Sequence, residues 1–296
     1  MIYKINGKIA LVGEVEREEN EDTIGATVSF NSLKEYKNGD KLKVYDGKKL
    51  KWEGMIISCS INTVPPHSYT AMDYGFNLKS EEHAQIKGRA DVAIKNLCKK
   101  FGIPVECCQI PTVINKMYPD QPISDIFSDI LKLSGKEQGK SYRMSVDKGK
   151  LLFKEKGKEK VTSKFLVSDE VSLTRSIEEM FNSVKIISED TEDKRIYATA
   201  KDKTSIKRYG LLQTVETVSS KKISGAKAIS ENRLKSLCKE KVELPITILA
   251  VDGAWDIKVS MLIKLNLKQN KGWHRIRSLT HHAEDDTIDI TLEWLE

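Results

Sequence analysis

The chain has 296 residues, of which 39% are hydrophobic and 31% charged, and its formal net charge is +6 at pH 7. This composition is typical of a folded globular protein and excludes a disordered chain or one built from membrane-spanning helices, because no segment approaches the roughly 18 apolar residues of a span. The length allows two or three domains. The first residues alternate between apolar and polar positions and carry no apolar signal region, so no export is expected.

The cysteines and the charge distribution restrict the chemistry further. The five cysteines are an odd set, spread widely except for one adjacent pair, so they predict neither a disulfide framework nor a zinc knuckle, and a reducing cytoplasm fits best. Residues 132–164 contain 11 basic and 4 acidic residues, a surplus larger than that of the whole chain. Alternating lysine and glutamate, as in residues 154–160, is typical of a solvated hairpin loop. A nucleic-acid site is less favoured there, because arginine and aromatic residues do not interleave.

The first eighty residues are predicted to form β-strands. Residues 23–30 and 50–57 are rich in strand-forming types, and Asn38-Gly39 and Asp46-Gly47 are dipeptides that tight hairpin turns prefer. Short strands with frequent turns predict a small antiparallel barrel over residues 1–78.

The middle of the chain is predicted to be an α+β unit spanning residues 79–165. Apolar residues three or four apart from Ile86 to Phe101 predict a helix that ends at Gly102. A second helix is expected from Pro122 to Leu133, and the segment 141–153 predicts a hairpin.

The remainder of the chain, residues 166–296, is predicted to form a second antiparallel barrel with one helix near Ala226 to Cys238. The expected strands are Asn182–Ser188, Arg195–Ala200, Leu244–Val251, Met261–Leu267, Trp273–Thr280 and Thr287–Trp294. The predicted fold class is therefore α+β, mainly β, with two small antiparallel β-barrel domains and an intervening α+β unit.

Enzyme signatures of fixed spacing are missing from the sequence, including a glycine-rich phosphate loop, H-E-x-x-H and G-x-S-x-G. The best candidate for chemistry is His281-His282 followed by Glu284, Asp285 and Asp286, since imidazoles and carboxylates bind metals and relay protons. Adjacent side chains on a strand point to opposite faces, however, so a turn at the end of a strand is the favoured interpretation.

Three further residue sets are interpreted as structural. Cys107-Cys108 is interpreted as two half-buried free thiols, because neighbouring cysteines rarely pair. Glu178 and Glu179 would diverge by about 100° on a helix and are interpreted as surface charges. Four tryptophans could line a sugar-binding platform, but aromatic residues on strands are more often core or interface; they are Trp52, Trp255, Trp273 and Trp294. We therefore expect no catalytic, cofactor-binding or metal-binding residues.

Several sequence blocks resemble, in order, those of the baseplate hub proteins of contractile phage tails and tail-like (R-type) bacteriocins. Residues 68–78 and 97–104 resemble the block "A-x-D-x-x-x-x-L … F-G-I-P", and Ser124–Leu131 with Lys150–Phe153 resembles the helix and hairpin of the family. The later blocks are Ser172–Val184 ("S-I-E-x-M-x-N-x-V"), Ser205–Gln213 ("S-I-x-x-Y-G-x-L-Q") and Trp273–His282 ("Y-x-V-x-S-V-x-H").

This resemblance implies a non-enzymatic structural protein without cofactors. Family members of this kind would assemble as a homotrimer whose paired β-barrels form a pseudo-sixfold ring. The ring would bind the tail tube or a tube-initiator protein above, the spike protein below, and other baseplate proteins. The protein would assemble in the bacterial host cytoplasm and then reside in the particle, with no membrane and no nucleic acid as its main partner.

Two other classes of function remain open at this point. A tail-associated cell-wall hydrolase or glycan-binding module would require a cleft carboxylate or an aromatic platform. A nucleic-acid binder using residues 132–164 would show an affinity that falls steeply with salt.

Overall fold

The secondary structure is mainly β. The structure is a computed structural model that describes residues 1–167, 171–188, 195–218, 220–266 and 271–294. Within these residues it contains 21 strands and four α-helices, which confirms the predicted class of α+β, mainly β. No described helix has the length and apolar character needed to cross a membrane.

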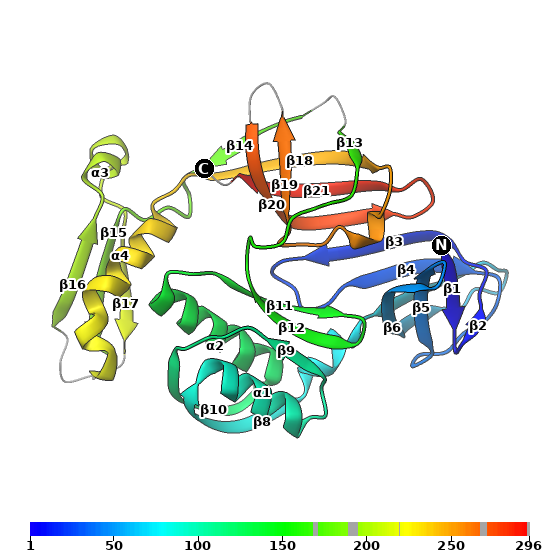
Figure 1. Cartoon of the computed structure of the whole chain (residues 1–296), viewed down its shortest axis with the longest axis horizontal. Helices are drawn as coiled ribbons and strands as arrows, with labels where there is room; N and C mark the ends of the chain where they lie inside the picture. The colour runs from blue at the N-terminus through cyan, green and yellow to red at the C-terminus, as the bar shows by residue number, and fades with distance from the viewer. Residues whose placement is uncertain (168–170, 189–194, 219, 267–270, 295–296) are drawn as a thin grey trace.

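The N-terminal segment forms seven strands with the expected alternation of buried and exposed side chains (Figure 1). In β4 (Thr27–Ser32) the inward residues Val28 and Phe30 are buried. The predicted turn at Asp46-Gly47 joins two strands, whereas Asn38-Gly39 lies in the loop before β5. The other strands are β1 (Ile2–Ile5), β2 (Lys8–Ile9), β3 (Gly13–Asn20), β5 (Lys41–Asp46), β6 (Lys49–Ser60) and β7 (His67–Met72).

The C-terminal segment continues the same sheet. Strand β20 pairs with β3 antiparallel, with Leu279 opposite Glu19, so the N-terminal and C-terminal halves share one strand path in the order β13-β18-β21-β20-β3-β4-β7-β6-β5-β1-β2. Among the described residues this path does not close, so two separate closed barrels are not found. The C-terminal strands are β13 (Phe165–Val167), β14 (Thr174–Ser176), β18 (Lys241–Ala250), β19 (Leu262–Asn266), β20 (Lys271–His282) and β21 (Thr287–Trp294). Leu267, the expected end of one strand, lies outside the described residues.

The α+β unit in the middle of the chain packs its helices on two small sheets. The prediction of a helix from Ile86 is wrong for its first turn: residues 81–89 form a strand, because Ile86 pairs opposite Lys116 in an antiparallel ladder. The predicted hairpin is confirmed, with Met144 opposite Phe153. The elements are η1 (Tyr74–Lys79), β8 (Glu81–Arg89), α1 (Ala90–Lys100), β9 (Val105–Cys107), β10 (Val113–Pro122), α2 (Ile123–Gln138), β11 (Tyr142–Asp147) and β12 (Lys150–Glu155).

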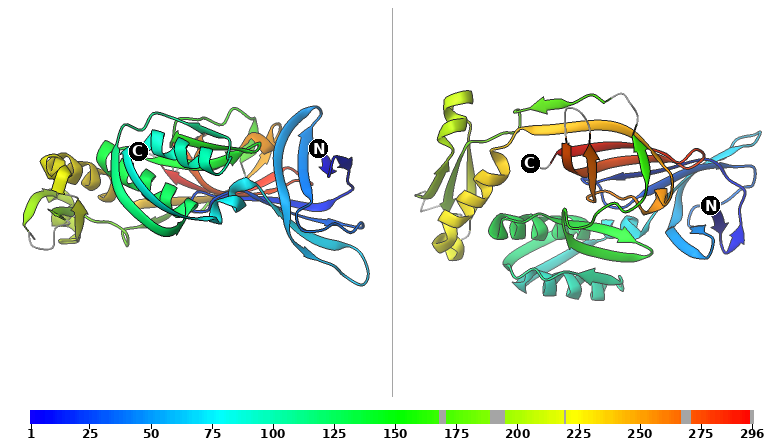
Figure 2. Two further views of the ribbon diagram at one scale, coloured as in Figure 1. Left: turned by 90° about the horizontal axis from the view of Figure 1, so that it is seen from below. Right: turned by 45° about the horizontal axis from the view of Figure 1, so that its top comes forward.

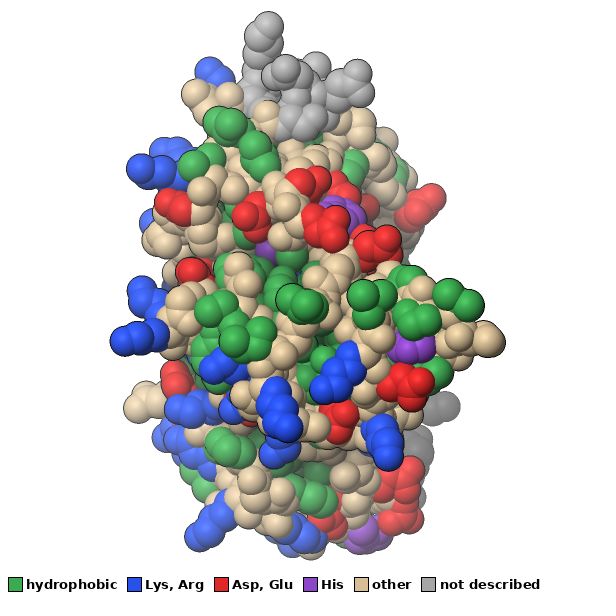
Figure 3. Space-filling view, turned by 90° about the vertical axis from the view of Figure 1, so that its right-hand side faces the viewer, with side chains coloured by type: hydrophobic (Ala, Val, Ile, Leu, Met, Phe, Trp, Pro, Cys, Tyr) green, Lys and Arg blue, Asp and Glu red, His purple; other side chains and the backbone are tan. Residues whose placement is uncertain are grey.

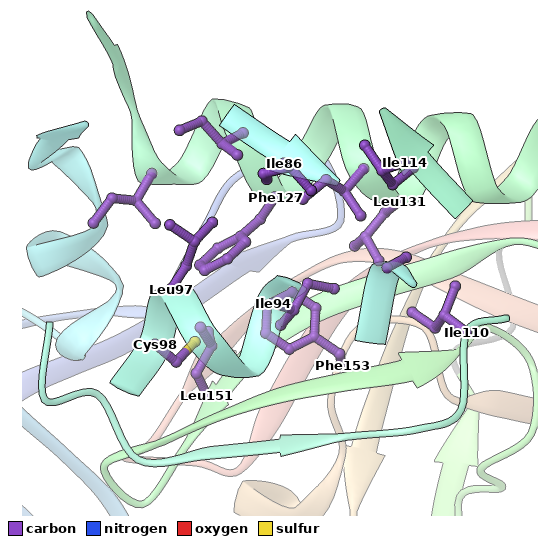
Figure 4. Packing of buried hydrophobic residues seen from close by; sticks show 14 of the residues in the cluster. Ile86, Ile94, Leu97, Cys98, Ile110, Ile114, Phe127, Leu131, Leu151 and Phe153 are labelled. Carbon is purple, nitrogen blue, oxygen red and sulfur yellow. The ribbon is translucent and has the colours of Figure 1, made fainter. Parts of the chain in front are cut away.

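The core of this unit lies between the helices and the sheets (Figure 4). The rings of Phe127 from α2 and Phe153 from β12 pack edge to face, with their centroids 5.1 Å apart, and both residues are fully buried. Ile94 and Leu97 of α1 lie three residues apart and face the same core. The helical spacing therefore identified the buried face of α1 correctly.

A second α+β unit interrupts the C-terminal segment. The strands expected near residues 182–188 and 195–200 are confirmed as strands, but not as parts of the C-terminal barrel. They form their own sheet because β15 pairs in parallel with β17. This unit stands apart from the main sheet and meets α2 through α4 (Figures 1 and 2). Its elements are β15 (Ser183–Ser188), β16 (Ile196–Lys201), α3 (Lys203–Tyr209), β17 (Gln213–Val218), η2 (Ser220–Gly225) and α4 (Ala226–Leu237).

Arg17 of β3 connects the two halves of the main sheet through buried hydrogen bonds. Its side chain is 1% exposed and donates hydrogen bonds to the carbonyl oxygens of Trp255 (2.8 Å) and Ile257 (2.6 Å), which lie in and after η3 (Ala254–Asp256). The guanidinium also lies 5.1 Å from the centre of the Trp255 ring. Burial lowers the pKa of Arg17, but the group remains protonated because of its very high intrinsic value.

Replacing Arg17 by alanine should destabilise the protein by about 3–5 kcal/mol, because two buried carbonyl groups lose their donor and Glu19 loses its cation. Urea unfolding would measure the change. Arg175→Ala is the matched control, since Arg175 is 54% exposed and pairs with Glu240 at 3.4 Å, and it should change little. Equal small effects of the two substitutions would contradict the role of Arg17.

Candidate functional site

A buried ionic cluster around Glu21 joins the three main parts of the chain. The Glu21 side chain is 1% exposed and accepts a hydrogen bond from the Ser260 hydroxyl at 2.7 Å. It forms ion pairs with Lys156 (3.0 Å), Arg277 (3.2 Å) and Arg275 (3.6 Å). Burial alone would raise the pKa of Glu21, but the positive charges of Arg275 and Lys156 outweigh it and the pKa is lowered.

The lysine-rich segment 154–160 contributes to this cluster, so its interpretation as a freely solvated hairpin loop is wrong. Strand β12 ends at Glu155, and the following residues run along the C-terminal segment, where Leu262 donates its backbone N–H to Glu159. Lys156 pairs with buried Glu21, and Lys154 lies 2.5 Å from Glu159. The positive charge concentrated here is therefore largely neutralised within the fold.

Further polar contacts around the Glu21 cluster join the same three parts of the chain, and together they form what we call the junction. Arg143 of β11 donates to the carbonyl oxygen of Val259 at 2.7 Å, and the Val259 N–H donates to the Glu19 carboxylate at 3.2 Å. Lys258 forms an ion pair with Asp147. A small cavity of about 30 Å³ lies among these residues, at the meeting point of all three parts. The junction fixes the α+β unit against both halves of the sheet.

Residues in the recognised sequence blocks also form structural joints. Asn182 is fully buried, and its side-chain amide donates to the carbonyl oxygen of Gly210 (2.7 Å) and to Ser205 (3.3 Å), while its oxygen accepts from the Leu212 N–H (2.8 Å). Asn182 belongs to one of the blocks that resemble the hub family, and it fixes the turn at Gly210 in the following block. Asp73 accepts from the N–H groups of Gly75 and Ala26, and burial raises its pKa to about 7.

The two histidines of the candidate cluster point in opposite directions, as the strand argument predicts. His281 is fully buried, with Nε2 3.1 Å from Asp286 Oδ1 and its ring 5.4 Å from the Trp255 ring. His282 faces the other side, where it contacts Glu16 (3.0 Å) and Asp289 (3.2 Å). Among the described residues no group of three or more histidines, cysteines or carboxylates is arranged to hold a metal ion.

The remaining candidates are separated in space. Cys107 and Cys108 are half-buried free thiols, and burial raises the pKa of Cys107 to about 12, which keeps it protonated. Glu178 and Glu179 are exposed in a turn after β14, so the assumption that they lie on a helix is wrong. The tryptophans form no common platform: Trp52 and Trp255 are buried in the N-terminal core, and the other two are half-buried.

One groove is lined in part by paired charges. A groove of about 510 Å³ lies between α2, β11 and α4 and contains lysines from the basic segment 132–164. Lys136 pairs with Glu216, and Lys140 lies 3.3 Å from Glu155. These two ion pairs reduce the positive charge that the groove offers to the phosphates of a nucleic acid.

Arg17 and Glu21 were not identified from the sequence. Arg17 lies in β3, on the same side of the strand as buried Val15, and Glu21 follows directly after the end of this strand. A charged residue at an inward position of an alternating strand was the available signal. Nothing in the local pattern distinguishes Glu21 from the neighbouring surface carboxylates.

The free energy of unfolding should depend on pH in part because of His281. Burial and nearby Arg17 lower its pKa to about 4, whereas an unfolded histidine titrates near 6.5. The unfolded state therefore takes up a proton first as the pH falls, and the contribution of His281 should drop by about 3 kcal/mol between pH 6.5 and pH 4. His281→Gln should remove this loss, as measured by urea unfolding at several pH values.

His282→Gln is the adjacent control, with the opposite sign. Burial lowers the pKa of His282, but Asp289 and Glu16 outweigh it and the pKa is raised. Its stabilising contribution is fully present below about pH 6.5 and is lost as the pH rises through the raised value. The same pH profile in both variants would contradict the assignment.

Comparison with known proteins assigns the chain to a family. A family model described as YQBQ-like matches residues 14–294. The YqbQ protein of Bacillus subtilis strain 168 is 26% identical over 220 residues, which is 70% of this chain and 66%, just under two thirds, of that protein.

Three tail proteins with solved structures are similar in fold to this chain. The 43 kDa tail protein of prophage MuSo2 from Shewanella oneidensis superimposes with a TM-score of 0.71 at 11% identity, covering 98% of this chain and 97% of that one. The tail protein from Neisseria meningitidis MC58 gives 0.72 at 13% identity, covering 99% and 95%. The prophage tail protein gp18 from Listeria monocytogenes EGD-e gives 0.64 at 12% identity, covering 95% and 87%. The chain belongs to the YQBQ-like family and has the fold of phage tail proteins.

Proposed function

We propose that this protein is a structural subunit of a phage tail or phage tail-like particle, acting as the baseplate hub that joins the tail tube to the central spike. The observation that carries this proposal is the match of the fold over nearly the whole length of both chains for two tail proteins. A match of this extent covers the main sheet and both α+β units together, so the arrangement of the parts is shared and not only one of them.

The construction of the molecule supports a mechanical role. Two charged side chains that are each 1% exposed, those of Arg17 and Glu21, lie where the parts meet and bind backbone carbonyls, lysine and arginine within the chain. Such joints keep the parts in fixed relative positions. A subunit that transmits force between a tube and a spike requires this kind of rigidity.

The proposed assembly is a homotrimeric ring. Each chain would contribute two β-rich segments, residues 1–78 and 166–296, so that three chains give a pseudo-sixfold arrangement able to adapt a sixfold tube to a threefold spike. The α+β unit, residues 79–165, would lie against this ring. Other baseplate proteins would bind its periphery, and the chain would act without a cofactor or turnover.

The copy number in purified particles tests this proposal. Tails or tail-like particles produced from a host that carries an affinity-tagged copy of this gene should contain three copies each, located by electron microscopy between tube and spike. Purified chain mixed with the neighbouring tube and spike proteins should also form a complex with three copies by light scattering. Particles that lack the chain would overturn the proposal, as would lysis of cell walls by the purified chain that one carboxylate substitution abolishes.

A further inference from the structure

The second α+β unit, residues 183–237, is built separately from the rest of the protein. We call its described residues the arm and the other described residues the body. The three strands of the arm pair with one another and with no described strand of the body. The arm also has its own buried core of Val184, Ile186, Ala226 and Ile229, and the core clusters described in the body contain no residue of the arm. Sheet pairing and a shared apolar core therefore do not fix the arm to the body.

The contact between the arm and α2 is polar. Lys136 of α2 forms an ion pair with Glu216 of β17, and Glu216 also pairs with Arg233 of α4 at 2.5 Å. The side-chain amide of Asn232 donates to the carbonyl oxygen of Glu137 at 3.5 Å. Burial alone would raise the pKa of Glu216, but Lys136 and Arg233 outweigh it and the pKa is lowered, so Glu216 is ionised at neutral pH. Units joined by polar contacts of this kind move relative to each other unless a large apolar interface holds them.

The segments that enter and leave the arm form its neck, residues 177–182 and 238–240. The Phe181 N–H donates to the carbonyl oxygen of Leu237 at 3.1 Å, so the two segments run side by side. Hinges in proteins consist of a few residues at the ends of secondary structure elements. The neck is a connection of this kind, and it gives the arm a pivot at one place.

The ion pairs of the neck lie near the surface. The Glu240 carboxylate accepts a hydrogen bond from the Tyr209 hydroxyl of the arm at 2.7 Å and pairs with Arg175 of β14 at 3.4 Å. Arg175 is largely exposed to solvent. Ion pairs that are open to water contribute little to stability, so these contacts offer little resistance to a turn of the arm.

The arm has space on two sides (Figures 1 and 2). The groove of about 510 Å³ lies between α4 on one side and β11 with residues 21–24 on the other. A second groove, of about 730 Å³, lies between α3, the neck and the end of β21. A turn of the arm about its neck would narrow one groove and widen the other without opening a buried core.

We propose that the arm turns about its neck as a unit, and that the ion pair between Lys136 and Glu216 is the latch that holds it in the position seen here. Breaking this latch leaves Glu216 paired with Arg233 inside the arm, so no buried charge loses its last partner. The joints at Arg17 and Glu21 differ, because separation there would leave a buried charge unpaired. This inference adds a movable part to the proposed structural role, and the isolated chain is sufficient to test it.

Single-molecule fluorescence energy transfer measures the position of the arm. Dyes attached through noncanonical residues at Lys203 of the arm and Lys87 of the body, both exposed, leave the native cysteines unlabelled. Large apolar side chains are exposed in the N-terminal segment, and Figure 3 shows hydrophobic side chains gathered at the end of the molecule opposite the arm. Single-molecule dilution keeps association through that end from altering the measured distance.

Wild-type chain should show one dominant transfer efficiency. Lys136→Met removes the latch and should raise the fraction of molecules outside the main peak about tenfold, since the open state is a minor population in the wild type. Lys136→Arg keeps the charge and should behave as the wild type does. Lys132→Met is the matched control, because Lys132 lies one turn earlier on α2 and lines the same groove, and it should leave the distribution unchanged.

Glu216→Gln removes the latch from the side of the arm and should raise the same fraction. A second dye pair within the arm, at Lys203 and Lys227, should keep its distance in every variant, because the arm moves as a unit. The proposal is overturned if a folded chain with Lys136→Met or Glu216→Gln keeps the wild-type distribution, or if Lys132→Met has the same effect as Lys136→Met. A change in the distance within the arm would also overturn it, since the arm would then have unfolded instead of turned.

Discussion

The burial of Arg17 is the constraint on which the rest of the architecture depends. A guanidinium that is taken out of water must find acceptors in the protein, and here the carbonyl oxygens of Trp255 and Ile257 provide them. These acceptors come from the far end of the chain. The N-terminal and C-terminal strands therefore cannot separate without leaving a buried charge unpaired. The backbone pairing of β3 with β20 joins the same two halves of the sheet.

Glu21 extends this constraint to the α+β unit. It lies four residues after Arg17 and binds Lys156, just beyond β12, together with Arg275 and Arg277 of β20. Opposite charges at one point hold three parts of the chain, and each partner reduces the cost of burying the others. With these two residues in place, the outer surfaces of all three parts have a defined relative orientation, which an assembly surface needs.

The sequence predicted the elements better than their partners. Alternation in Thr287–Trp294 and helical spacing in residues 123–133 reflect local rules, and both elements are present. The spacing of Ile86 and Ala90 fits a helix, yet a strand ends and a helix begins between them. The reason is that residues up to Arg89 pair with β10 and are held in the extended conformation. The separate unit around β15 was missed for the same reason: its parallel pairing with β17 joins residues 30 apart, which no local pattern records.

The sequence blocks that resemble the hub family contain polar residues that hold backbone segments together. Asn182 holds Ser205, Gly210 and Leu212, and Asp73 holds Ala26 and Gly75, so each conspicuous polar residue satisfies backbone groups that would otherwise be buried without partners. Apolar core positions accept many hydrophobic substitutions provided that volume and pattern are kept. Hydrogen-bonding joints tolerate few, since an unpaired buried group costs more than a repacked methyl group. We therefore expect substitutions at Asn182 and Asp73 to disturb this fold more than conservative substitutions in its apolar cores.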